Sequence, residues 1–451
     1  MRPLRPQLAL LTLTSALLAA APVRAAAAAS GAPADAEAAA LPATLTLDAA
    51  VALFRARGFD LLLADAQVAA AAGDLQAAGA SPNPQLSAGV THSPGYDASK
   101  CAGCSATGFN LGLSDQGALS DLLLTQKRGL RLDVARAALE AAKLSRADAQ
   151  RTLELALKTL FTQALLARAQ IDLAAEAKES AGRTRALNEK RFALGAVSEA
   201  DVARSEVAEL EAEQAREAAT QQLAAQRAAL GAFLGVRGAT PPPAFELDPK
   251  GLDFRVPQPL SQASAETLLQ AALEARPDLR AWALQRERAE ASIALVKRQR
   301  WPDLALNVGY AQQGSSSDSI SPPTVSVGVS LPLPILYQQG GELARAQADL
   351  AAQSAQRQKQ EAQVVADVRS AFAAFGAARA QVERMDTRLL GRARRARDLI
   401  EVQYQKGSAS LLDLLDAQRT FLAVNGERLA LLAGYWTAVA SLEAAVSKEL
   451  R

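Results

Sequence analysis

The stretch Val325-Ser326-Val327-Gly328-Val329-Ser330-Leu331 decides the fold, because apolar residues alternate with small or polar ones along its whole length. The same alternation runs through Leu304–Tyr310, and in the first half of the chain through Leu86–Thr91 and Phe109–Ser114. A period of two is typical of a β-strand with one apolar face and one polar face. No charge stands on the apolar side of these strands, as expected for contact with lipid. A strand of a soluble sheet shows the same pattern, so the rest of the chain has to decide between the two.

Outward from the strands, the sequence predicts very long helices. Between about Leu119 and Phe192 there is no proline, and at about 1.5 Å per residue such a helix extends roughly 100 Å. Steps of three and four residues separate the apolar positions Leu153, Leu157, Leu160, Ala164, Ala167 and Ile171, and likewise Val365, Val368, Phe372 and Phe375. These heptad steps predict coiled-coil packing. A globular domain has no room for such helices, so little in the chain is left to cover the apolar faces of the strands.

The two halves of the chain resemble each other, which indicates an internal duplication. The pair Asp60-Leu61 recurs as Asp278-Leu279. Further along, the residues Phe192, Gly195, Ser198 and Asp201 correspond in order and spacing to Tyr404, Gly407, Ser410 and Asp413. We therefore expect each half to contain a helix, a strand pair and a long coiled-coil hairpin.

Five segments follow from these patterns. Residues 1–25 are typical of a signal peptide, with Arg2 and Arg5 before an apolar run and a small-residue cleavage site. Residues 26–44 are rich in alanine and expected to be disordered. The first repeat is predicted at 45–235, a proline-rich linker at 236–262 and the second repeat at 263–451. Since no later run of 18 or more apolar residues is evident, a helical membrane protein is excluded.

The composition excludes several classes of function. The 49 basic and 47 acidic residues are interspersed, which argues against a nucleic-acid partner. One histidine and two cysteines are too few for a multi-histidine metal site or a cysteine-rich zinc module, so we expect neither a metal site nor a cofactor. No Ser-His-Asp set or phosphate-binding glycine loop is evident, so we do not expect an enzyme.

Short motifs flank the strands in a definite order. Ser81-Pro82-Asn83-Pro84-Gln85-Leu86 and Trp301-Pro302-Asp303-Leu304 each lead into a strand. Leu331-Pro332-Leu333-Pro334 and Gln339-Gly340-Gly341-Glu342 lead out of the last one, and Tyr404-x-x-Gly407 precedes the run Leu411–Gln418. Over about residues 45–448 this order resembles the TolC-like outer-membrane efflux proteins, also called outer membrane factors. The Leu-Pro-Leu-Pro form is similar to the branch that serves heavy-metal cation efflux, whereas the first strand-to-helix return, Ser120–Gly129, lacks the Gly-Gly turn.

The resemblance implies a mainly α-helical fold with a small β-barrel. Three chains would each give four strands to a 12-stranded outer-membrane β-barrel, continued by a long periplasmic α-helical coiled-coil barrel. It implies an efflux channel in the outer membrane of a Gram-negative bacterium, in contact with outer-membrane lipid. The implied partners are two further copies in a homotrimer, a periplasmic adaptor (membrane fusion) protein and an inner-membrane transporter of the resistance-nodulation-division type.

Two questions stay open at this point. A periplasmic coiled-coil adaptor, or a structural protein of an export system, is the alternative function, and the duplicated plan argues against it. The exported substrate, a metal cation or an organic toxin, is not named by any residue of the chain.

The resemblance also implies a gate at the periplasmic entrance, formed by Tyr404, Asp413 and Asp416. The two aspartates stand three residues apart and share one helix face. Threefold symmetry would make them two carboxylate rings, which select cations in pores. Two solvated acids on a helix face are the alternative. Ala409 stands where the family's namesake carries an arginine that helps to close the entrance. Which residues hold the closed state in this chain is therefore an open question.

The resemblance makes the hairpin tips the contact with the adaptor. Gly195 and Gly407 interrupt long helices and allow tight turns, and Ser198 and Ser410 follow them.

Cys101 and Cys104 lie between the first two strands. In the barrel this loop is extracellular, outside the reducing cytosol, which favours a disulfide between them; two unpaired thiols are the alternative. His92 and Asp97 are candidates for a surface metal site, although a polar strand end is the simpler interpretation of His92.

Overall fold

The computed structural model describes residues 42–100, 104–236, 245–313 and 323–450. All of these except Pro42 belong to one compact unit, Ala43–Arg451. The helices are α1 Leu47–Arg57, α2 Phe59–Gly79, α3 Ala118–Ser120, α4 Lys127–Ala193, α5 Glu199–Phe233, α6 Gln258–Ser261, α7 Ala265–Ala275, α8 Pro277–Gln299, α9 Gly340–Arg384, α10 Leu390–Gln405 and α11 Leu411–Val446. The strands are β1 Thr44–Leu45, β2 Gln85–His92, β3 Thr107–Ser114, β4 Glu246–Leu247, β5 Ala305–Gln313 and β6 Thr324–Ser330. The predicted signal peptide and residues 26–41 lie outside the described residues.

The four predicted strands are confirmed, and they form one antiparallel sheet in the order β2-β3-β5-β6. The register pairs Leu86 with Leu113, Leu113 with Val308, and Val308 with Val327. Residues paired across a sheet point to the same side, so the apolar residues of all four strands share one face. The opposite face carries serine, threonine, asparagine, glutamine and small residues, and none of the four strands contains a residue with a full charge.

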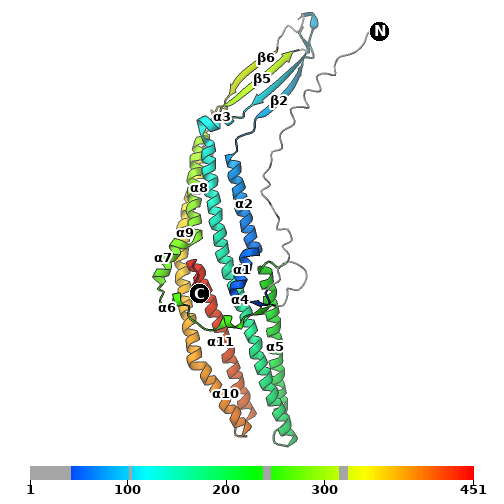
Figure 1. Cartoon of the computed structure of the whole chain (residues 1–451), viewed down its shortest axis with the longest axis vertical. Coiled ribbons are helices and arrows are strands. Elements are labelled where there is room, and N and C mark those ends of the chain that lie inside the picture. Colours follow the sequence, from blue (N-terminus) through cyan, green and yellow to red (C-terminus); the bar gives the residue numbers. More distant parts are fainter. Residues whose placement is uncertain (1–41, 101–103, 237–244, 314–322, 451) are drawn as a thin grey trace, which may run out of the picture. The chain divides into compact units, whose positions relative to one another are not determined.

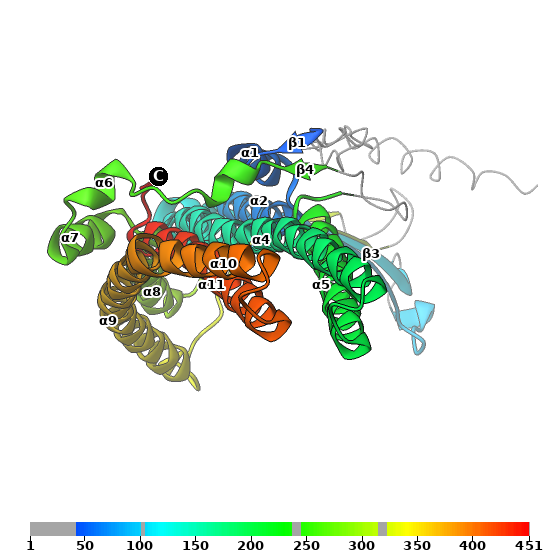
Figure 2. The same cartoon turned by 90° about the horizontal axis from the view of Figure 1, so that it is seen from below.

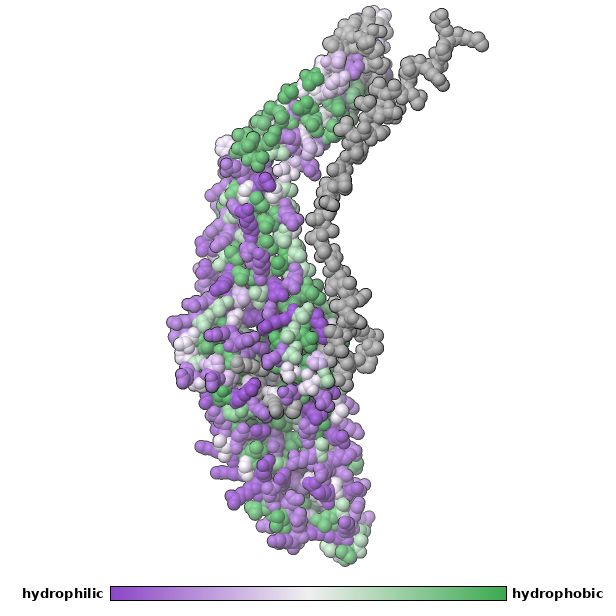
Figure 3. Space-filling model, in the orientation of Figure 1, coloured by the Kyte–Doolittle hydropathy of each residue, from purple (hydrophilic) through white to green (hydrophobic). Residues whose placement is uncertain are grey.

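The apolar face of this sheet is uncovered. Val90 is 71% exposed, Val325 74% and Val327 72%, and Figure 3 shows apolar colouring over the strands while polar colouring dominates the helices. A continuous exposed apolar face marks a surface that contacts another protein or a membrane.

The helices form two long hairpins, one of α4 and α5 and one of α10 and α11. The sheet adjoins the start of α4. The turns of both hairpins lie at the opposite end of the helices, far from the sheet (Figure 1). Seen from below, the two hairpins lie next to each other (Figure 2), and α4 contacts α11. The predicted heptad positions Leu157, Ala164 and Ala167 are buried.

The element order repeats between the halves, from α1 to α5 and again from α7 to α11. Thr46 caps α1 by accepting a hydrogen bond from the amide of Ala49 at 3.2 Å. The part of the linker from Phe245 onward is packed against the helices, because β4 pairs in parallel with β1 and the side chains of Phe245 and Leu260 are buried. The exact limits of the two repeats remain a prediction.

The first long helix begins later than the prediction of about Leu119. A short helix, α3, and a π-helical turn, Asp121–Thr125, come first, and Gln126 adopts a left-handed conformation with φ 53° before α4 begins. Gln339, with φ 54°, holds the same place before α9. Both strand-to-helix returns therefore use a left-handed glutamine, which sequence does not reveal because glutamine has no preference for that conformation.

Helix α11 is long and apolar enough to cross a membrane by length and composition alone. However, 67% of its apolar window is buried inside the protein, as expected of a helix in the protein core.

Candidate functional site: the helical tips and the pocket at the end of α11

The two hairpin tips have the same backbone geometry. Gly195 has φ 71° and Gly407 φ 77°. The following amide donates to a carbonyl five residues earlier: Ala196 N lies 2.8 Å from Arg191 O, and Ser408 N lies 2.9 Å from Gln403 O. This helix ending requires a positive φ, which glycine adopts without strain. The predicted turns at both glycines are thus present.

A serine capping box starts the helix after each tip. Ser410 Oγ accepts a hydrogen bond from Asp413 N at 3.1 Å, and Asp413 Oδ2 accepts one from Ser410 N at 3.0 Å. Ser198 and Asp201 repeat these bonds at 3.2 and 3.3 Å. Each pair satisfies amides that a helix start otherwise leaves unpaired. Ser198 and Ser410 therefore fix the shape of the tips.

The two predicted gate carboxylates share an exposed face of α11. Asp413 and Asp416 are exposed, whereas Leu414 and Leu415 are buried. The hydroxyl and then the amide of Ser410 hold the pKa of the Asp413 carboxyl below its usual value. Asp416 has no hydrogen bond or ion pair with any other residue that the structure describes. Asp413 is thus engaged in the capping box, and Asp416 is available to solvent.

Tyr404, the third predicted gate residue, lies on the buried side of the same tip. It is 4% exposed and packs against Leu411 and Leu414. Its hydroxyl donates a hydrogen bond to Oδ1 of Asn188, a fully buried residue on α4. The structure therefore brings Tyr404 together with Asn188 across the two hairpins. It leaves the carboxylates of Asp413 and Asp416 on the exposed face of α11.

Arg191 completes this contact between the hairpins. Its guanidinium lies over the Tyr404 ring, 4.8 Å from the centroid, and its Nη2 donates to the carbonyls of Tyr404 at 3.1 Å and of Gln405 at 3.0 Å. A cation is favourable at these carbonyls because they end helix α10. We call Asn188, Arg191 and Tyr404 the tip clamp.

Sequence reasoning missed Asn188 and Arg191. One signal for Asn188 was available: the alignment of Phe192 with Tyr404 also places Asn188 opposite Ile400. Ile400 packs in the apolar cluster around Tyr404. A polar residue whose repeat partner is a core residue is a candidate for a specific polar contact.

The remaining predicted positions lie elsewhere. Cys101 is outside the described residues, so its disulfide with Cys104 stays a prediction. His92 ends β2, as the polar strand-end interpretation expects, with Nδ1 3.2 Å from Oγ1 of Thr107. Ala409 packs against the cluster around Tyr404. In the described ranges, no three His, Cys, Asp or Glu residues are grouped so as to hold a metal ion, and the absence of a metal site remains a prediction.

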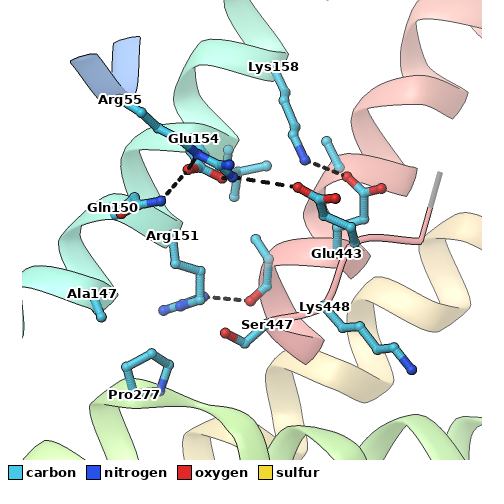
Figure 4. A pocket seen from close by; sticks show the side chains of 14 residues that line it. Arg55, Ala147, Gln150, Arg151, Glu154, Lys158, Pro277, Glu443, Ser447 and Lys448 are labelled. Atoms are coloured by element: carbon cyan, nitrogen blue, oxygen red, sulfur yellow. Dashed lines mark hydrogen bonds and ion pairs between the residues drawn. The ribbon is translucent and has the colours of Figure 1, made fainter. Parts of the chain in front are cut away.

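A polar pocket of about 290 Å³ lies between α1, α4, the start of α8 and the end of α11 (Figure 4). Arg55 Nε lies 2.6 Å from Oε1 of Glu154. Lys158 Nζ lies 2.8 Å from Oε2 of Glu443, whose side chain is only 4% exposed. Arg151 Nη1 donates to Ala444 O at 2.7 Å, where helix α11 ends. The ion pair of Lys158 with Glu443 and the hydrogen bond of Arg151 to Ala444 O therefore tie the end of α11 to α4.

A second buried ion pair adjoins the end of α11. Arg276 Nη2 lies 2.6 Å from Oδ2 of Asp278, and Arg276 Nη1 lies 3.1 Å from Oδ2 of Asp367. Burial raises the pKa of the Asp278 carboxyl, but the hydrogen bond and charge of Arg276 outweigh it, so the net shift is downward. Arg276 also donates to Ala445 O at 3.4 Å.

The chain is similar to a known protein family and to individual known proteins. A family model described as "Outer membrane efflux protein" matches residues 50–236 and 268–447. The cobalt-zinc-cadmium resistance protein CzcC of Cupriavidus metallidurans is 25% identical over 408 residues, which cover 88% of this chain and 89% of that protein.

Two solved structures show the same fold. CusC, described in terms of its folding and transmembrane channel formation, has a TM-score of 0.70 at 18% identity, covering 89% of this chain and 92% of that one. The outer membrane protein VceC from Vibrio cholerae has a TM-score of 0.71 at 19% identity, covering 90% of this chain and 97% of that one.

Proposed function

Because this chain belongs to the outer membrane efflux protein family, we propose that three copies of it form one channel with a 12-stranded barrel. The chain is an outer-membrane efflux protein that extends into the periplasm, and its family consists of channels rather than enzymes. The arrangement of three copies is our inference.

One observation carries the barrel proposal: the sheet has an uncovered apolar face and an uncharged polar face. Four strands are too few to close a barrel, and β2 and β6 are left as edges. Inside a bilayer an unpaired edge is not tolerated, since no water is present to satisfy its backbone groups. Pairing β6 of one copy with β2 of the next, three times around, removes every edge and turns all the apolar faces outward.

The test is the mass and the gel mobility of the protein purified from outer membranes. We expect a trimer in mild detergent and a band that changes mobility only after heating. A folded monomer in detergent that inserts into vesicles would overturn the trimer.

We propose that the tips dock a periplasmic adaptor, which links the channel to an inner-membrane transporter of the resistance-nodulation-division type. Leu194 at one tip is 84% exposed and Leu412 at the other is 65% exposed. Apolar side chains at the ends of water-facing helices favour a protein partner. Leu194→Glu combined with Leu412→Glu should abolish adaptor pull-down and leave the trimer intact. Unchanged pull-down would contradict docking at the tips.

For the cargo, we propose divalent metal cations. The support is the resemblance to CzcC, whose name refers to cobalt, zinc and cadmium resistance. A deletion strain should become sensitive to these three cations and recover when the gene is returned. If sensitivity rose only toward organic toxins, the metal proposal would be wrong.

We propose that Asp413 and Asp416 form carboxylate rings at the periplasmic entrance, and that the tip clamp keeps this entrance narrow. Asp416 is the sharper test, because Asp413 also serves the capping box. Asp201→Ala is the matched control, since it removes the same capping box in the first repeat. Asp416→Ala should raise single-channel conductance and weaken blockade by divalent cations, and Asp413→Ala should exceed Asp201→Ala in both. Equal conductance and equal blockade by divalent cations in all three variants and the wild type would refute the proposed carboxylate rings.

A further inference from the structure

An apolar collar lies at the junction between the sheet and the long helices. We define it as Leu122–Leu124, Trp301 and Leu333–Tyr337. Within it Leu123 is 69% exposed, Ile335 75% and Leu336 100%. Trp301 of the Trp301-Pro302 motif and the second Leu-Pro of the Leu-Pro-Leu-Pro motif thus lie in this collar, and the channel function leaves the exposure of their side chains unexplained.

The collar continues the apolar face of the sheet. Val325, Val327 and Val329 lie on that face in β6, and the alternation runs on beyond the strand as Leu331 and Leu333. The four strands have 7 to 9 residues each, whereas a tilted membrane-spanning strand needs about 9–11. The sheet alone is therefore short for a bilayer, and the collar adds apolar surface at the end where the long helices begin.

Basic residues border the collar beside Trp301, and one exposed carboxylate, that of Glu342, accepts a hydrogen bond from the Tyr337 hydroxyl at 2.6 Å. Lys297 and Arg300 are exposed at the end of α8, directly before Trp301. Arg298 donates to Thr125 O at 2.6 Å and to Leu124 O at 3.2 Å, which fixes the leucine turn against α8. This order, from apolar to aromatic to basic, matches a membrane interface, where tryptophan and tyrosine lie at the headgroups and cations near phosphates.

We propose that the collar is embedded in the periplasmic leaflet of the outer membrane. Leu122–Leu124 and Leu333–Leu336 contact acyl chains, Trp301 and Tyr337 lie at the headgroups, and Lys297 and Arg300 bind lipid phosphates. The basic border favours lipid over a second copy of the chain as the occupant. This inference rests on the proposed barrel for the orientation of the sheet.

The first test uses tryptophan fluorescence in vesicles of phosphatidylethanolamine and phosphatidylglycerol with brominated acyl chains. Trp301 is 65% exposed and Trp436 only 2%, while Trp282 is half-buried. Bromine near the headgroup should quench the wild type several-fold more than bromine at the chain end, and Trp301→Phe should lose this difference. Identical quenching in both proteins would mean that Trp301 does not lie at the headgroups and would overturn the proposal.

The second test places charges in the collar. Leu123→Glu with Leu336→Glu should reduce insertion into these vesicles at least tenfold, while Leu194→Glu, the same change at an exposed tip leucine, should not. Trimer mass and heat-modifiable mobility are measured on every variant. If the double variant formed a normal trimer and inserted normally, the collar proposal alone would be refuted. If the wild type itself formed no trimer, the proposed barrel would be refuted.

Discussion

Replacing Asp278 by Asn tests whether the buried ion pair next to the end of α11 holds the start of α8 against α9 and α11 within the second repeat. Asp278 is 7% exposed and Arg276 2%. The substitution keeps the size of the side chain and removes its charge, so Arg276 keeps Asp367, at 3.1 Å, as its ionic partner among the residues that the structure describes. Asp60→Asn is the matched control, because Asp60 is the repeat counterpart in the first turn of α2 and is exposed.

The expected loss follows from the burial of the pair. Removing one partner of a buried ion pair destabilises a protein by about 3–5 kcal/mol, and the remaining Asp367 puts this case near 3. At about 1.4 kcal/mol per factor of ten, amide protection should fall on the order of 100-fold. Asp60→Asn should change stability by less than about 0.5 kcal/mol. Any effect of a charge in the first helical turn is lost from both variants and cancels in the comparison.

The assay is amide hydrogen exchange, read by mass spectrometry on the trimer in detergent. Peptides covering the start of α8 and residues 440–446 should lose protection in Asp278→Asn, since Arg276 donates to Ala445 O. Peptides from the tips should exchange as in the wild type. Equal protection in the two Asn variants would refute the reasoning.

The same pair predicts a pH dependence. Since the folded pKa of Asp278 is lowered, its contribution is present above the ordinary aspartate pKa of about 3.9 and is lost as pH falls through the lower folded value. Exchange in these peptides, corrected for the intrinsic pH effect, should therefore accelerate below about pH 4 in the wild type and less in Asp278→Asn. An identical acid response would contradict the downward shift.

Three further substitutions test the tips and the pocket. Tyr404→Phe removes the hydroxyl that donates to the buried Asn188 side chain, which should destabilise the tip by about 1–3 kcal/mol. It should therefore increase channel openings in bilayer recordings; unchanged gating would exclude the tip clamp from the gate. Ser198→Arg should abolish efflux while the trimer assembles, whereas Ser198→Ala should cost about 1 kcal/mol of cap stability and retain efflux. Normal efflux in the Arg variant would count against tip docking. Lys158→Met should lower protection at the end of α11 by up to about 3 kcal/mol because it removes the cation that pairs with the buried Glu443 carboxylate at 2.8 Å. Adding Glu443→Leu should restore most of it; no restoration would mean that the pair acts through packing instead.

Much of this architecture could be predicted from local patterns. Alternation predicted all four strands of the sheet, heptad steps predicted buried positions on α4, and Gly195 and Gly407 marked the two tips. Each of these signals depends on neighbours in the sequence, since strand and helix periods and the conformational freedom of glycine act over a few residues. The left-handed conformations of Gln126 and Gln339 escaped prediction, because nothing in a glutamine side chain favours them.

The sequence by itself determined the two-faced strands, the long helices and the duplication. Only the tertiary structure decided which side chains meet: Tyr404 with Asn188, 216 positions apart, and Lys158 with Glu443. It also decided that Asp413 serves a capping box while Asp416 remains free toward solvent. The physical reason is that such contacts depend on how two packed helices are aligned and rotated, which no local pattern of polarity records.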